Sequence, residues 1–272
     1  MITVELVKLV RRPRVWVSIG LLCLLPIIVA IFISSTKIAP PPGQGGAFLS
    51  AVLSNGSLYP AAAMAMVVPL FLPIAVAVLA GDAIAGEATS GMLRYLLIRP
   101  VGRTRLLVAK LISLTAFVLL AVVMVLATSW LTGRLLFGSA PVVQTGITSL
   151  SGTVLTPTQI ALRLAASLGY ITISMLGVAA IALFLSTVTD SPLGATLGAL
   201  ATLVGSELLV TLSAAASISP YLPTRYWLAW VDFFRVPVLW RDIERGVALQ
   251  AVYVVVFLGA AWANFMTKDV KS

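Results

Sequence analysis

The chain alternates long apolar stretches with short polar ones, and the apolar stretches have the length of membrane spans. A helix needs about 20 predominantly apolar residues to cross the hydrocarbon core of a bilayer. Six stretches meet this requirement, and each predicts one transmembrane helix: Val15–Ile33, Pro60–Ala80, Leu111–Leu131, Leu164–Leu185, Leu193–Ser213 and Val247–Met266. We therefore expect an all-α membrane protein whose residues 1–272 form a single transmembrane domain.

Composition supports this prediction and narrows the function. The chain is 60% hydrophobic and only 10% charged, whereas a soluble domain carries about 25% charged residues. The net charge of +9 does not indicate nucleic acid as a partner, because the bases stand at the ends of the apolar stretches, as membrane orientation requires. The sequence contains no histidine, which removes histidine-dependent zinc peptidases and proton relays.

The basic residues also predict the orientation of the chain. With the N-terminus inside, eleven of the eighteen Lys and Arg residues fall on the inner side, and most of them stand close to span ends. Short cytoplasmic loops carry such an excess. We expect a multi-pass protein of the cytoplasmic (inner) membrane with both termini in the cytoplasm.

The first twelve residues predict a short helix that lies along the inner membrane surface. Pro13 is expected to end it before the first span begins. We assign its residues to an apolar face (Ile2, Leu6, Leu9 and Val10) and a charged face (Glu5, Lys8 and Arg12).

A polar and basic island, residues 81–105, separates the second and third predicted spans. It holds two of the nine acids and four of the eighteen bases, so we expect it outside the hydrocarbon, in the cytoplasm. Inside it, the pairs Met92-Leu93 and Leu96-Leu97 repeat at i, i+1, i+4 and i+5. This spacing places them on one face of a short helix, which we expect to dock on a soluble partner.

The island also resembles a known motif. The runs Ala85-Gly86-Glu87, Gly91-Met92-Leu93-Arg94 and Leu96-Leu97-Ile98-Arg99-Pro100-Val101, followed by Arg103 and Lys110, resemble the cytoplasmic segment after the second span of type-2 (ABC-2) permeases of ATP-binding-cassette exporters. The six-span layout extends the resemblance to the whole chain. By this resemblance the ATPase-coupling residues are Gly86, Glu87, Gly91, Met92, Leu93, Arg94, Leu96, Leu97, Arg99, Pro100 and Arg103.

The resemblance implies partners. The working unit of such exporters has two permease chains, identical or paralogous, and two cytoplasmic ATPase subunits, within membrane lipid. This chain contains no G-x-x-x-x-G-K-[ST] motif, which an ATPase of this kind needs to hold phosphates. We therefore expect no enzyme activity here, with ATP and Mg²⁺ bound by the partner, and an unidentified amphiphilic substrate that is exported.

Two other function classes stay open at this point. An ion-coupled secondary carrier needs several ionisable groups buried in the membrane, and the sequence offers one clear case, Glu207, in the fifth predicted span. Its candidate partner is Arg163, and the pair is either structural or part of a transport path. An intramembrane enzyme has few known designs without histidine.

The long outer loop, residues 217–246, is rich in aromatic side chains. Trp227, Trp230 and Phe234 follow at i, i+3 and i+7, which predicts a short helix half-sunk in the outer interface. It would serve as an anchor or as a lid over an exit path.

Overall fold

The computed structural model describes residues 2–36, 56, 59–89, 102–137, 147–148 and 154–267. Within these ranges the chain is almost entirely helical, with one pair of two-residue antiparallel strands, β1 and β2. The elements in chain order are α1 (Ile2–Arg11), α2 (Pro13–Thr36), α4 (Tyr59–Val67), α5 (Phe71–Thr89), α7 (Arg103–Phe137), β1 (Ile147–Thr148), β2 (Val154–Leu155), α8 (Pro157–Val188), α9 (Pro192–Thr211), the 3-10 helices η2 (Ser213–Ala215), η3 (Ser219–Tyr221) and η4 (Ala229–Phe234), and α10 (Trp240–Thr267).

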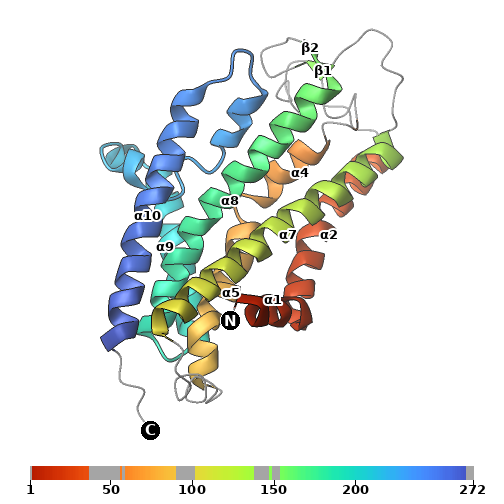
Figure 1. The fold of residues 1–272 in the computed structure, drawn as a ribbon. Helices are drawn as coiled ribbons and strands as arrows, with labels where there is room; N and C mark the ends of the chain where they lie inside the picture. Colours follow the sequence, from red (N-terminus) through yellow and green to blue (C-terminus); the bar gives the residue numbers. More distant parts are fainter. Residues whose placement is uncertain are drawn as a thin grey trace.

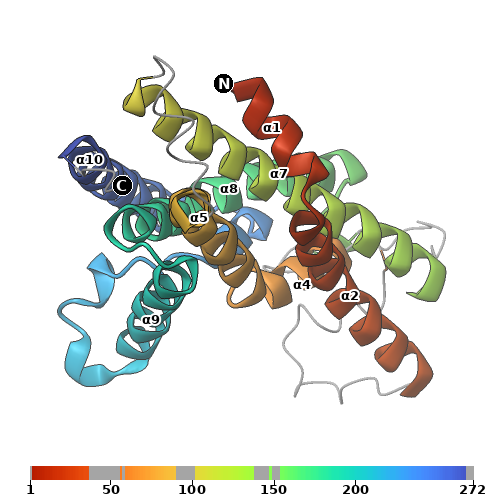
Figure 2. The same ribbon diagram turned by 90° about the horizontal axis from the view of Figure 1, so that it is seen from below.

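Six of these helices are long and apolar enough to cross a membrane: α2, α5, α7, α8, α9 and α10. Helix α8 lies at the centre and contacts α5, α7, α9 and α10 (Figures 1 and 2). Helix α7 has 35 residues, so it is about 52 Å long. That length exceeds the hydrocarbon thickness of about 30 Å, and α7 accordingly runs obliquely across the bundle (Figure 1). The prediction of a multi-pass helical membrane protein is confirmed.

The second predicted span was placed wrongly. We expected one helix over Pro60–Ala80, but the structure has α4, a turn over residues 68–70 and then α5. Pro69 causes the break, since it lacks an amide hydrogen and disfavours a helical conformation in the residue before it. Pro73 is tolerated because it stands in the first turn of α5, where the amide has no partner within the helix.

Polar side chains start two of the spans. At the start of α8, the Thr156 hydroxyl accepts the Gln159 amide at 3.3 Å, and the Gln159 side chain accepts the Thr156 amide at 3.0 Å. This reciprocal pair is a capping box. At the start of α9, the Ser191 hydroxyl accepts the amide of Gly194 at 3.2 Å. Each cap gives a partner to an amide at the helix start that has none within the helix.

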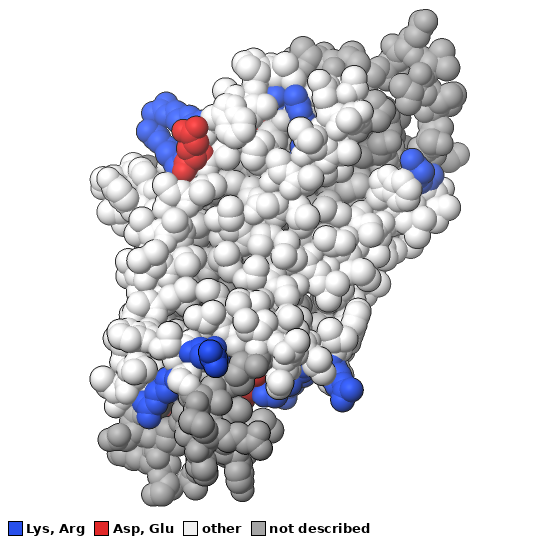
Figure 3. Space-filling model, viewed as in Figure 1, with Lys and Arg blue, Asp and Glu red and all other residues white. Residues whose placement is uncertain are grey.

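The charges that Figure 3 shows gather at the two ends of the molecule, with a broad uncharged band between them. Helix α1 and the last turn of α10 lie at the same end (Figure 1). Uncharged surface of this kind is what a bilayer core accepts.

Several aromatic side chains of the long loop pack into the core, and whether the loop serves as an anchor or a lid stays a prediction. Trp230 is almost fully buried, and Trp227 and Phe234 are buried with it. Residues 229–234 form η4, which packs on α8 and α10. The Trp230 and Phe234 rings meet edge to face with their centroids 6.2 Å apart. The i, i+3, i+7 spacing therefore marked side chains that pack between η4, α8 and α10.

A topology measurement checks the predicted orientation. We expect a reporter that is active only outside the membrane to be silent when fused after Lys271 and active when inserted within residues 40–46. The reason is the excess of bases on the inner side of the predicted layout. Signal from the first fusion together with silence from the second would invert the orientation.

Candidate functional site

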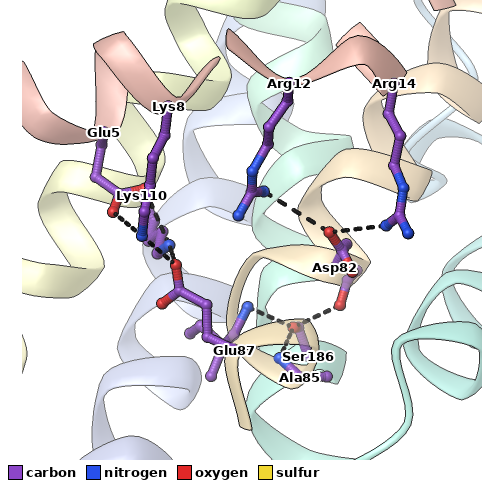
Figure 4. Close-up of polar contacts among 11 residues, drawn as sticks. Glu5, Lys8, Arg12, Arg14, Asp82, Ala85, Glu87, Lys110 and Ser186 are labelled. Atoms are coloured by element: carbon purple, nitrogen blue, oxygen red, sulfur yellow. Dashed lines mark hydrogen bonds and ion pairs between the residues drawn. The ribbon is translucent and has the colours of Figure 1, made fainter. Parts of the chain in front are cut away.

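A cluster of four charged side chains, three of them buried, joins three helices at the end of the bundle that carries α1. The members of this charge cluster are Glu5 and Lys8 of α1, Glu87 of α5 and Lys110 of α7 (Figure 4). Lys110 Nζ lies 2.9 Å from Glu5 Oε2 and also donates to Glu87 Oε1. Lys8 Nζ donates to Glu87 Oε1 at 2.9 Å and lies 3.4 Å from Glu5 Oε1. Each ammonium therefore contacts both carboxylates.

The charge cluster is shielded from solvent. The side chains of Glu5, Glu87 and Lys110 are 6%, 3% and 4% exposed, and Lys8 covers them with 28% exposure. Burial alone lowers the pKa of Lys8, but the adjacent carboxylates of Glu87 and Glu5 outweigh it and raise the pKa above its ordinary value. Lys8 is therefore charged at neutral pH, and two positive groups balance two negative ones. A cavity of about 30 Å³ adjoins the charge cluster, which is about the volume of one water molecule.

A second ionic contact lies more than one helical turn closer to the start of α5, at Asp82. Asp82 Oδ2 is 3.3 Å from an Arg14 nitrogen and 3.7 Å from an Arg12 nitrogen (Figure 4). A Cβ atom at Gly86 would stand 2.3 Å from Asp82 Oδ1. Gly86 lies inside α5, and its lack of a side chain leaves room for the Asp82 carboxylate.

The opposite side of the same helical turn is bonded to α8. The hydroxyl of Ser186, which is fully buried, donates to the Gly81 carbonyl at 2.7 Å. It accepts the amides of Ile84 and Ala85 at 3.1 and 2.9 Å. Just beyond, the Thr89 hydroxyl donates to the Asp190 carbonyl at 3.0 Å. In a span, where no water replaces a lost hydrogen bond, such contacts fix one helix against another.

The start of α7 is fastened to the end of α10. Arg103 donates to the carbonyls of Phe265 and Met266 at 2.7 and 2.9 Å. A cation at this place also suits the negative end of the α10 dipole. The Trp262 indole donates to the Thr104 hydroxyl at 2.9 Å. Residues on both sides of the stretch 90–101 are thus fixed to neighbouring helices.

The structure accounts for three of the eleven predicted coupling residues. Gly86 and Glu87 lie in α5, not in a loop outside the membrane helices, and Arg103 is the first residue of α7. Residues 81–89 continue helix α5, and bases from α1, α2 and α7 neutralise their two acids within the fold. The predicted position of this segment outside the hydrocarbon stays a prediction. The other predicted residues lie outside the described ranges: Gly91, Met92, Leu93, Arg94, Leu96, Leu97, Arg99 and Pro100.

The faces of α1 differ from the prediction. We expected the side with Glu5 to face water, but Glu5 is buried together with Leu9, and Val4, Val7 and Val10 are exposed. Glu5 and Leu9 stand at i and i+4, so they share one helix face. The pairing of Glu5 with Lys110 is what makes burial of that face possible. Sequence reasoning missed Glu5 and Lys8 as site residues, although their spacing of three was a signal.

The structure does not bring Glu207 and Arg163 together. Arg163 donates to the carbonyl of Arg235 at 3.4 Å, and none of the ion pairs among the described residues contains Glu207. Glu207 is exposed on α9, so the interior of this chain does not enclose it. Its role stays a prediction.

The comparison with known families covers most of the chain. Residues 23–271 match the family described as "Protein of unknown function (DUF2705)". The chain belongs to this family. No match was found among curated proteins. The family match includes Asp82, Glu87 and Lys110 but not Glu5 or Lys8, which precede residue 23.

The arrangement is mechanical in character. Within the described residues, no group of three or more Cys, Asp and Glu side chains is placed to hold a metal ion. The charge cluster instead makes α1, the last turns of α5 and the first turns of α7 into one unit. In this member of the DUF2705 family, a force applied to residues 90–101 would reach the spans through that unit.

Proposed function

We propose that the chain is the transmembrane permease subunit of an ATP-driven exporter of the type-2 class, powered by a separate ATPase subunit. The observation that carries the proposal is the fastening of both flanks of residues 90–101. Glu87 binds Lys8 and Lys110 on one flank, and Arg103 binds the end of α10 on the other. A stretch held in this way can pass a displacement to α5, α7 and α10 together.

The sequence of that stretch supports the proposal. Leu93 and Leu97 form one face of the predicted short helix, and an apolar face on a cytoplasmic helix requires a partner. The matching motif of type-2 permeases places the ATPase there. ATP binding would close the two ATPase subunits on each other, and the closure would move the 90–101 stretch and the spans joined to it. The substrate class follows from the resemblance alone, as an amphiphile.

An ion-coupled secondary carrier is the alternative, and the charge cluster supplies the buried charges that it would have to use. A carrier uses buried charges that exchange partners during transport. Here every ammonium of the charge cluster contacts two carboxylates at the end of the bundle, an arrangement suited to a permanent joint. The two functions differ in energy source, which an experiment can separate.

Capture of the tagged chain from its native membranes tests the proposal. We expect a soluble ATPase with a phosphate-binding loop to co-purify, and Leu93→Asp to abolish its capture while the chain still inserts. A buried unpaired charge at an interface costs about 3–5 kcal/mol, enough to disrupt a complex. Leu93→Met keeps the apolar face and is the matched control.

The outcomes are distinct. Equal capture of the ATPase by wild type, Leu93→Met and Leu93→Asp would remove Leu93 from the interface. Absence of any ATPase from the captured material, together with substrate movement that stops when ion gradients are collapsed, would establish the carrier instead.

A further inference from the structure

The outward side of α1 carries a groove that neither the charge cluster nor the proposed export function uses. It has a volume of about 490 Å³, and its lining includes Val4 and Val7, which we call the apolar wall, and Lys8, Arg11 and Arg12, which we call the basic wall. Helix α1 lies against α7 at the edge of the bundle (Figure 2). The groove therefore opens to the surroundings of the protein and not to the interior of the bundle.

The apolar wall lacks a cover within the described part of the chain. Val4 and Val7 are 56% and 50% exposed. Beside them, the exposed Trp16 donates its indole N–H to the Val10 carbonyl at 2.7 Å. Tryptophan is enriched where the hydrocarbon of a bilayer meets its headgroups. If α1 lies along the inner membrane surface, as the sequence predicts, the apolar wall meets the start of the acyl chains.

The basic wall has more positive charge than the neighbouring acids balance. Among the described residues, Lys8, Arg12, Arg14 and Lys110 form ion pairs with three acids, Glu5, Asp82 and Glu87, and Arg11 adds a further positive charge on α1. Arg11 is exposed and forms none of the ion pairs found among the described residues. The surplus favours an anion, and guanidinium groups bind phosphate with two parallel hydrogen bonds.

We propose that this groove binds an anionic phospholipid, with its phosphate on Arg11 and Arg12 and the start of an acyl chain on Val4 and Val7. The two walls together require both parts of that ligand: a free phosphate leaves the valines exposed, and a neutral lipid leaves the arginine surplus unbalanced. The inference does not depend on the export function, because it concerns binding to the chain itself.

Binding there would act on the charge cluster. Lys8 and Arg12 line the groove and also contact Glu87 and Asp82. A phosphate beside them adds a negative charge to a group of side chains that has a positive surplus, so the lipid holds α1 against α5 and α7. A ligand that binds only the folded protein also raises its stability.

Native mass spectrometry of the purified, delipidated full chain tests the proposal. The protein is titrated with phosphatidylglycerol, with phosphatidylcholine of the same acyl chains, and with inorganic phosphate as competitor. We expect tighter binding of phosphatidylglycerol than of phosphatidylcholine, and Arg11→Gln to weaken phosphatidylglycerol binding about five-fold, the effect of one basic residue at an anionic membrane surface. Phosphatidylcholine binding should not change.

Two further variants make the result specific. Arg105→Gln removes an exposed base from the first turn of α7, outside the groove, and should leave lipid binding unchanged. Val7→Ser should weaken phosphatidylglycerol binding without affecting any charge. Both Arg11 and Val7 are exposed, so the variants are expected to fold, which the melting temperature in detergent verifies.

Four outcomes would overturn the proposal. Phosphatidylglycerol and phosphatidylcholine could bind alike, or Arg11→Gln and Arg105→Gln could have equal effects, and either result would leave only general attraction to the membrane. Complete displacement of the lipid by an equal concentration of inorganic phosphate, with no effect of Val7→Ser, would define an anion site without a lipid. Cross-linking from position 7 to a protein chain, and not to lipid, would assign the groove to a protein partner.

Discussion

Replacing Lys110 by methionine should destabilise the protein more than any other single change in the charge cluster. The substitution keeps the volume of the side chain but leaves Glu5 and Glu87 with Lys8 as their shared counter-ion. One buried negative charge is then uncompensated, and breaking a buried pair in this way costs about 3–5 kcal/mol. Thermal unfolding of the purified chain in detergent measures the loss as a lower melting temperature.

Two variants separate the charge effect from a general packing defect. Adding Glu5→Gln to Lys110→Met restores a balanced Lys8–Glu87 pair, so the double variant should be more stable than Lys110→Met alone. The second variant, Arg14→Gln, is the control, because it removes a base that is 72% exposed beside Asp82. Exposed pairs contribute about 0–1 kcal/mol, so the melting temperature should change little. Suppose that Glu5→Gln lowers the melting temperature of Lys110→Met by as much as it lowers that of the wild type. The charges would then not act as one cluster.

The membrane class and most spans could be predicted because they depend on local properties. A run of about 20 apolar residues is sufficient to identify a span, and five of the six predicted spans lie largely within the helices observed. The exception is the second predicted span, Pro60–Ala80. At Pro69 the hydropathy stays high, but the backbone cannot continue the helix. There the backbone chemistry of a single proline ended the helix, although the mean hydropathy of the stretch predicted that it would continue.

The charge cluster could be predicted only in part, since it depends on contacts between residues far apart in sequence. Glu87 and Lys110 were recognised in one motif, although not as a pair. Their partners Glu5 and Lys8 belong to a helix about 80 residues earlier, which looked like a surface helix by composition. Hydropathy treats each acid as a reason to leave the membrane, and it cannot register that a base on another helix cancels the charge.

The contact between α5 and α9 was also not predictable from periodicity, because it depends on a glycine. Gly81 brings the backbones of the two helices close together: a Cβ atom there would stand 2.9 Å from the Thr196 amide nitrogen and 3.2 Å from its Cα. Close approach through glycine is a common way for membrane helices to associate. The Gly81 carbonyl also accepts a hydrogen bond from the Ser186 hydroxyl of α8.

Gly81→Ala should therefore destabilise the protein, although alanine is the better helix former. The added methyl group meets backbone atoms, which cannot rotate away, so α9 has to shift from α5 at a cost of about 1–3 kcal/mol. Gly20→Ala is the matched control, because a Cβ atom at Gly20 of α2 has nothing within 4 Å. There the same substitution should be neutral or stabilise by up to about 1 kcal/mol, the helix preference of alanine over glycine. The melting temperatures of both variants in one detergent give the comparison, and a Gly81→Ala protein as stable as Gly20→Ala would show that α5 and α9 do not pack through this glycine.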